Sequence, residues 1–95
     1  MTFLKDVGFS EELIKGIEKD IPELLQEQIK NHKDLVLENI NYLKDLGITN
    51  YQETFMAYSG MFLLDVSQFQ DIFNKYDRED LVKKIEKNVA IIEHL

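Results

Sequence analysis

The chain has 95 residues, no cysteine, and 11 Lys and Arg against 18 Asp and Glu, which gives a formal net charge of −7. The missing cysteine excludes a disulfide framework, a thiolate metal site and a cysteine nucleophile. The negative charge disfavours nucleic acid and anionic membranes as partners, because a polyanion is repelled at long range and counterion release would contribute little.

The composition is that of a single domain, residues 1–95, because 44% apolar residues supply the material for one modest core. The amino terminus meets acidic residues before any long apolar run, so it does not read as a signal peptide. No stretch reaches the roughly 18 apolar residues of a membrane helix. We therefore expect a cytoplasmic protein that does not enter a membrane.

A short phrase recurs along the chain. Residues 3–8 read FLKDVG, residues 42–47 read YLKDLG, and residues 91–95, IIEHL, are interpreted as a third copy. The first two copies lie 39 residues apart, a spacing within the range of helical repeat proteins. This predicts an all-α protein, a small helical-repeat array of five to six short amphipathic helices, built from two units of about 3–41 and 42–90.

In the first unit, Ser10 is a good N-cap for a helix that has Glu11 and Glu12 in its first turn, where carboxylates favour the helix dipole. Pro22 ends this helix or begins a short second one. The pattern leaves open whether residues 22–46 form one helix or two. Three apolar side chains of this stretch are predicted to face inward: Leu24, Leu25 and Ile29.

Across the boundary between the two units, apolar spacing predicts a helix over residues 33–46 that ends at Gly47. Thr49 and Ser67 each stand three residues before a Gln, which predicts two capping boxes and helix starts at about 50 and 68. Asp77 opens a last helix, in which the apolar spacing continues to residue 92. No segment alternates with a period of two, so no sheet is predicted.

Seven aromatic residues recur at nearly helical spacing in the second unit. Such a stripe usually belongs to the core, but this number of rings also suits an exposed groove that binds a partner. The stripe consists of Tyr51, Phe55, Tyr58, Phe62, Phe69, Phe73 and Tyr76. The candidate partner-binding residues are Tyr51, Phe55, Tyr58, Phe62, Ile91 and Leu95.

Motifs that carry chemistry are missing from the sequence. His32 and His94 lie far apart and have no matching His-Glu spacing, so we expect exposed histidines and no metal. There is no Gly-rich phosphate loop and no Gly-x-Ser-x-Gly elbow. The sequence therefore predicts no catalytic residues, no cofactor and no enzyme.

A short helix, a Pro-x-Leu-Leu element and a longer helix that ends in Leu-x-x-Leu-Gly resemble the helical repeat of mitochondrial transcription termination factors (mTERF). The residues that carry this resemblance are Pro22, Leu24, Leu25, Tyr42, Leu43, Leu46, Gly47, Leu63 and Leu64. Met61 stands where a second Pro would be expected, and the basic face of the family is missing. The resemblance implies an arc of stacked helices, and as an alternative function a nucleic-acid-binding regulator.

The leading expectation is a small acidic, non-catalytic interaction module that binds a protein or peptide through an apolar aromatic surface. A third hypothesis is self-association. Residues 89–92 are apolar around most of a helical turn, so we expect Ile91 and Leu95 to lie on one exposed face of the last helix. That face would support a homodimer through the C-terminal helix.

Overall fold

The computed structural model describes all 95 residues, and it confirms the all-α class. Six α-helices and three short 3₁₀ helices follow one another, with no strand. The 3₁₀ helices, labelled η, were not predicted. In chain order the elements are η1 (Thr2–Val7), α1 (Glu11–Asp20), α2 (Glu23–Asn31), α3 (Lys33–Leu46), α4 (Tyr51–Ala57), η2 (Ser59–Leu63), α5 (Val66–Asn74), α6 (Arg78–Lys87) and η3 (Val89–His94).

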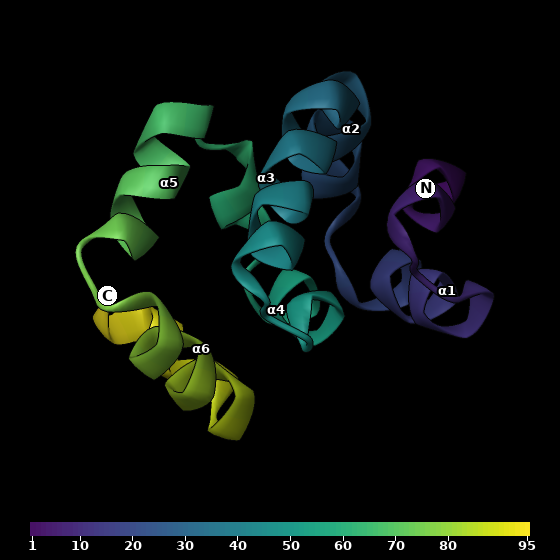
Figure 1. Cartoon of the computed structure of the whole chain (residues 1–95). Helices are drawn as coiled ribbons and strands as arrows, with labels where there is room; N and C mark the ends of the chain where they lie inside the picture. The colour runs from purple at the N-terminus through teal and green to yellow at the C-terminus, as the bar shows by residue number, and fades with distance from the viewer.

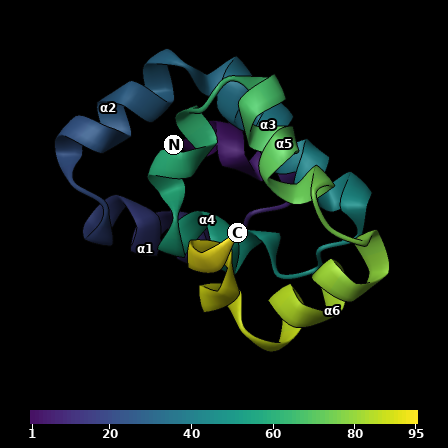
Figure 2. The ribbon, with the colours of Figure 1, turned by 90° about the vertical axis from the view of Figure 1, so that its left-hand side faces the viewer.

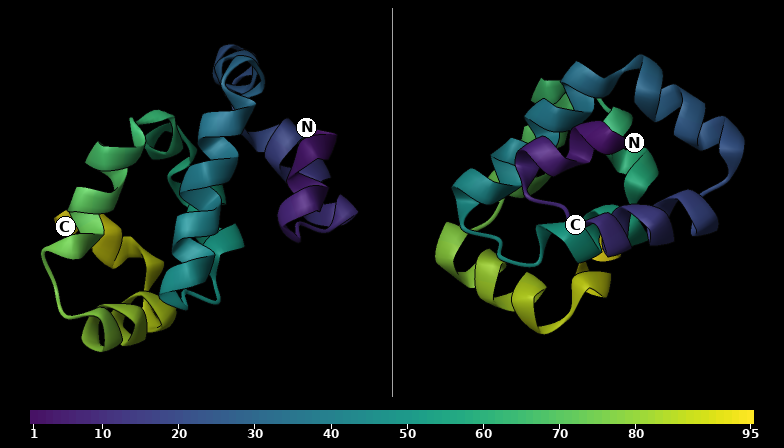
Figure 3. Two further views of the ribbon diagram at one scale, coloured as in Figure 1. Left: turned by 45° about the horizontal axis from the view of Figure 1, so that its top comes forward. Right: turned by 90° about the vertical axis from the view of Figure 1, so that its right-hand side faces the viewer.

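Helix α3 is the centre of the fold. It contacts η1, α2, α4, η2 and α5, whereas α1 and the N-terminus lie on one side of it and α5, α6 and the C-terminus on the other (Figure 1). The short helix α4 lies beside α1 (Figures 2 and 3). No helix combines the length and the apolarity that crossing a bilayer requires.

Residues 22–46 form two helices. The break falls at His32, whose φ of −120° and ψ of 35° are not helical. Leu24 is 72% exposed, so its predicted inward orientation is wrong, while Ile29 is fully buried as predicted. Gln26 takes an inward position instead, because its amide donates to carbonyls at the end of α1.

The first two copies of the repeated phrase form the same helix end. Gly8 and Gly47 have left-handed backbones, with φ of 99° and 94°. In both, the glycine N–H bonds the carbonyl three residues back and the next N–H bonds the carbonyl five residues back, which is a Schellman motif. The apolar residue after each glycine, Phe9 or Ile48, is buried. Two copies of the phrase therefore encode one local structure.

The match does not extend beyond this local motif. Gly8 ends a 3₁₀ helix of six residues, and Gly47 ends an α-helix of 14 residues. Residues 91–95 contain no left-handed residue, so the third copy does not form the motif. The two-unit repeat and the mTERF resemblance stay predictions.

Two of the four predicted helix caps are confirmed. Ser10 accepts from the third backbone N–H of α1, and Asp77 does the same at α6. Thr49 and Ser67 are not caps. Thr49 bonds a side chain of α6, and the backbone N–H of Ser67 donates to Asp65, which caps α5 from a position two residues earlier.

The last helix is shorter than predicted. It ends at Lys87, because Asn88 is extended and its side chain accepts from the N–H of Ala90 to begin η3. The chain then folds back, so that η3 packs against α6 and α4 (Figure 2). Ile91 and Leu95 are half-buried in this arrangement. The exposed apolar face expected for a homodimer is therefore not formed there.

A row of five buried phenylalanines runs through the core. Successive ring centroids are 5.6, 5.1, 5.1 and 5.2 Å apart, with edge-to-face or tilted geometry. The row joins the loop after η1 to α4, η2 and α5, and hence the first part of the chain to the last. It consists of Phe9, Phe55, Phe62, Phe69 and Phe73.

Candidate functional site

The residues predicted to bind a partner do not form one surface. Phe55 and Phe62 are fully buried members of the phenylalanine row, so their assignment as contact residues is wrong and the core interpretation holds for them. Ile91 and Leu95 are half-buried on η3 and at its end. Sequence spacing predicts Phe55 and Phe62 on one aromatic stripe, and the structure places both in the core.

The two tyrosines of the predicted set bond within the chain. The hydroxyl of Tyr51 donates to the carbonyl of Val7 at 2.9 Å, and that of Tyr58 donates to a carboxylate oxygen of Glu93 at 3.0 Å. Burial and this hydrogen bond raise the pKa of Tyr58 above its ordinary value. Both tyrosines therefore tie elements together.

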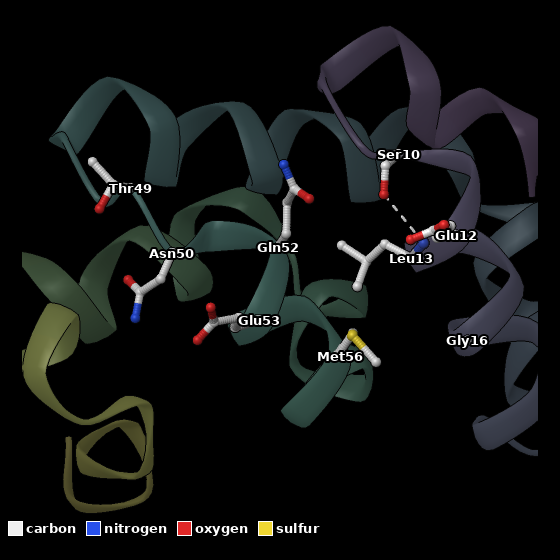
Figure 4. A pocket seen from close by; sticks show the side chains of 9 residues that line it. All are labelled: Ser10, Glu12, Leu13, Gly16, Thr49, Asn50, Gln52, Glu53 and Met56. Atoms are coloured by element: carbon white, nitrogen blue, oxygen red, sulfur yellow. Dashed lines mark hydrogen bonds between the residues drawn. The ribbon is translucent and has the colours of Figure 1, made fainter.

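A groove with a volume of about 550 Å³ lies between α1 and α4 (Figure 4). Its lining combines two apolar side chains, two carboxylates, several neutral polar groups and a bare glycine. The residues that line it are Ser10, Glu12, Leu13, Gly16, Thr49, Asn50, Gln52, Glu53 and Met56. None of them belongs to the predicted partner-binding set.

Hydrogen bonds to the turn at Gly8 set the spacing of the two helices. The carbonyl of Val7 accepts from the hydroxyl of Tyr51 and from the ammonium of Lys44 at 3.0 Å. The carbonyl of Gly8 accepts from the amide of Gln52, also at 3.0 Å. Since Tyr51 and Gln52 begin α4 and Gly8 lies just before α1, these bonds fix one wall of the groove against the other.

The middle of the groove is apolar. Leu13 and Met56 are half-buried, and Figure 4 shows both side chains pointing into the gap between α1 and α4. Gly16 has no side chain and leaves this part of α1 bare. A Cβ there would make an ordinary contact with the terminal methyl of Met56, at 3.8 Å, so Met56 lies opposite the bare turn. The gap therefore offers apolar contact to an incoming side chain.

Unpaired carboxylates flank this apolar part. Glu12 stands on α1 and Glu53 on α4, both exposed, and neither forms an ion pair or a side-chain hydrogen bond. The nearby Lys5 is engaged at 2.6 Å by Glu11, whose pKa it lowers through a hydrogen bond and its charge. No Lys, Arg or His lines the groove. Its charge is therefore negative and uncompensated.

One sequence signal could have pointed to this groove. Gly16 lies in the interior of a helix, where Gly costs about 1 kcal/mol relative to Ala. A glycine there leaves one turn of the helix without a side chain, so that another group can approach its backbone closely. Met56, on the other wall, lies 40 residues further along the chain, and no local pattern connects it to Gly16.

His32 and His94 are exposed and lie outside the groove, and no group of three or more His, Asp or Glu side chains is placed to hold a metal ion. Comparison of the chain with protein families, with curated proteins and with solved structures found no match. The assignment of a function therefore rests on the geometry and charge of the groove.

Proposed function

We propose that this protein is a small non-catalytic interaction module that binds a segment of another protein in the groove between α1 and α4. The observation that carries the proposal is an apolar gap, formed by Leu13 and Met56, between the unpaired carboxylates of Glu12 and Glu53. Its volume of about 550 Å³ lies within the range of binding pockets.

The charge of the chain supports a basic or neutral partner. The net charge of −7 and the two free carboxylates attract a positively charged segment and repel a polyanion. A cytoplasmic location is part of the proposal. We do not propose self-association through η3, because Ile91 and Leu95 are half-buried within the chain.

The lining of the groove favours binding over catalysis. Its titratable groups are two carboxylates, and Ser10, the hydroxyl nearest to α1, already accepts from the N–H of Leu13. No base stands beside a nucleophile in this lining, as covalent catalysis requires. The alternative, an mTERF-type nucleic-acid regulator, would need a basic face, which the groove does not offer.

Selection of ligands by the folded protein tests the proposal. A phage library of random dodecapeptides is panned on the wild type, and selected peptides are synthesised and measured by calorimetry. The variant Gly16→Leu fills the apolar gap and is expected to weaken binding roughly tenfold or more, a loss of about 1.4 kcal/mol. The matched control is Gly60→Leu, since Gly60 faces open space away from the groove.

The proposal fails if no peptide is enriched, or if enriched peptides bind Gly16→Leu as tightly as the wild type. Circular dichroism confirms that both variants fold. Fluorescence anisotropy with single- and double-stranded probes tests the alternative. Submicromolar nucleic-acid affinity that survives physiological ionic strength would favour the mTERF-type function instead.

A further inference from the structure

Helix α6 carries a close copy of the sequence of α1. Residues 11–22 read EELIKGIEKDIP and residues 79–90 read EDLVKKIEKNVA, with identical residues at six of the twelve positions. Most other positions differ conservatively, but Gly16 corresponds to Lys84. The two helices therefore allow a comparison at one position where they differ strongly.

The residue at this position, Gly16 in α1 and Lys84 in α6, determines whether the acidic residue four positions earlier forms an ion pair. On α6, the ammonium of Lys84 lies 3.0 Å from Asp80, one turn earlier. On α1, the corresponding acid is Glu12, and the corresponding position, Gly16, has no side chain. Residues four apart share one face of a helix. Glu12 thus lacks the cation that its counterpart has, and the space for that cation opens into the groove.

No cation of the chain takes this place. Lys5 is held by Glu11, and Lys15 lines a separate hollow together with Lys5 and forms no ion pair with Glu12. Glu12 therefore faces the groove without a partner, beside the apolar surface of Leu13.

We infer that the groove receives a Lys or Arg side chain of the bound segment, which pairs with Glu12. This inference rests on the proposed function. The aliphatic stem of such a residue lies over Gly16 between Leu13 and Met56, because long cationic side chains bury their stems on apolar surface and keep their charge in water. Glu53, on the opposite wall, adds a second negative charge.

The peptides selected by panning serve as probes. Each Lys in a selected peptide is replaced by norleucine, which keeps the stem and removes the charge. On the wild type, one such replacement is expected to weaken binding about fivefold, the upper range for an exposed ion pair. On Glu12→Gln the same replacement is expected to change binding less than about twofold.

The matched control is Glu38→Gln, which removes one charge from an exposed position of α3 outside the groove. Norleucine should weaken binding to this variant as much as to the wild type. If Glu12→Gln and Glu38→Gln behave alike, the preference for a cation comes from overall charge and the inference is wrong. A third outcome separates the inference from the proposed function. If Gly16→Leu blocks peptide binding but replacing the Lys or Arg residues of the peptide does not change its affinity, the inference fails while the proposed function stands.

A small probe tests the inference without a selected peptide. N-acetyl-lysine methylamide is titrated into labelled protein, with N-acetyl-norleucine methylamide as the uncharged control. The lysine derivative alone is expected to shift the amide resonances of Glu12 and Gly16, and Glu12→Gln should abolish the shift. Equal shifts for the two derivatives, or no shift at these amides, would overturn the inference.

Discussion

Alanine at Gly8 should destabilise the protein more than alanine at Gly47, although the two turns have the same backbone geometry. Both glycines are left-handed, so alanine at either position costs about 1 to 2 kcal/mol of backbone strain. At Gly47 a Cβ would meet nothing within 4 Å, whereas at Gly8 it would lie 2.6 Å from the hydroxyl oxygen of Tyr51. Gly8→Ala therefore forces the hydroxyl of Tyr51 away from the carbonyl of Val7.

The loss of that hydrogen bond adds about 1 kcal/mol, the usual net contribution of such a bond. We expect Gly47→Ala to lower the free energy of unfolding by about 1 to 2 kcal/mol and Gly8→Ala by about 1 kcal/mol more, about 2 to 3 kcal/mol. In a Tyr51→Phe background the hydroxyl is gone and the nearest ring carbon lies at an acceptable 3.8 Å. The cost of Gly8→Ala should fall there to that of Gly47→Ala.

Urea unfolding followed by far-ultraviolet circular dichroism measures the free energy of unfolding of five proteins by linear extrapolation: the wild type, Gly47→Ala, Gly8→Ala, Tyr51→Phe and the double variant with both Gly8→Ala and Tyr51→Phe. The double-mutant cycle isolates the term that comes from Tyr51, because the two residues touch. Equal costs of Gly8→Ala and Gly47→Ala, or a cost of Gly8→Ala that persists with Tyr51→Phe, would refute this account of the turn.

Two further predictions concern polar side chains. Asn39 is fully buried, and its amide donates to the carbonyls of Phe62 and Leu64 at 3.0 Å. Asn39→Leu should therefore lower the free energy of unfolding by about 2 to 3 kcal/mol in urea unfolding, and a neutral effect would contradict this. The raised pKa of Tyr58 comes from burial and from its bond to Glu93, so the stability that it contributes is present below its unfolded pKa near 10 and is lost as pH rises through its folded pKa. Tyr58→Phe should lessen the alkaline loss of stability and reduce the late part of the tyrosinate absorbance change, to which Tyr42 also contributes because burial raises its pKa too. An unchanged alkaline profile would argue against that role.

The sequence predicts those helix ends whose hydrogen bonds join residues close together in the chain. A Schellman motif spans about six residues, so the repeated phrase together with the one apolar residue after its glycine, Phe9 or Ile48, contains all that it needs. The caps at Ser10 and Asp77 likewise act over three residues. The cap at Asp65 was missed because a competing Ser67 pattern lies two residues away.

The spacing of apolar residues does not predict the orientation of side chains that form hydrogen bonds with another element. Periodicity predicted Leu24 inside, but Gln26 is turned inward because two carbonyls at the end of α1 need donors, at 2.7 Å each. Arg78 similarly donates to the carbonyls of Asp45 and Leu46 at the end of α3. Each donor and its acceptor lie between 5 and 33 residues apart in the sequence, and no pair lies within one helix. The 3.6-residue period of one helix therefore cannot predict these hydrogen bonds.

The groove depends on long-range contacts of this kind. Helix α4 has seven residues, too few for a stable isolated helix, so tertiary contacts must hold it in place. Two of these contacts are Phe55 in the phenylalanine row and the bond from Gln52 to the carbonyl of Gly8. The left-handed turn at Gly8 thus positions one wall of the groove as well as ending η1. A change at Gly8 that displaces Tyr51 should therefore weaken peptide binding. The same change at Gly47, which does not line the groove and where a Cβ would meet nothing within 4 Å, should leave binding intact.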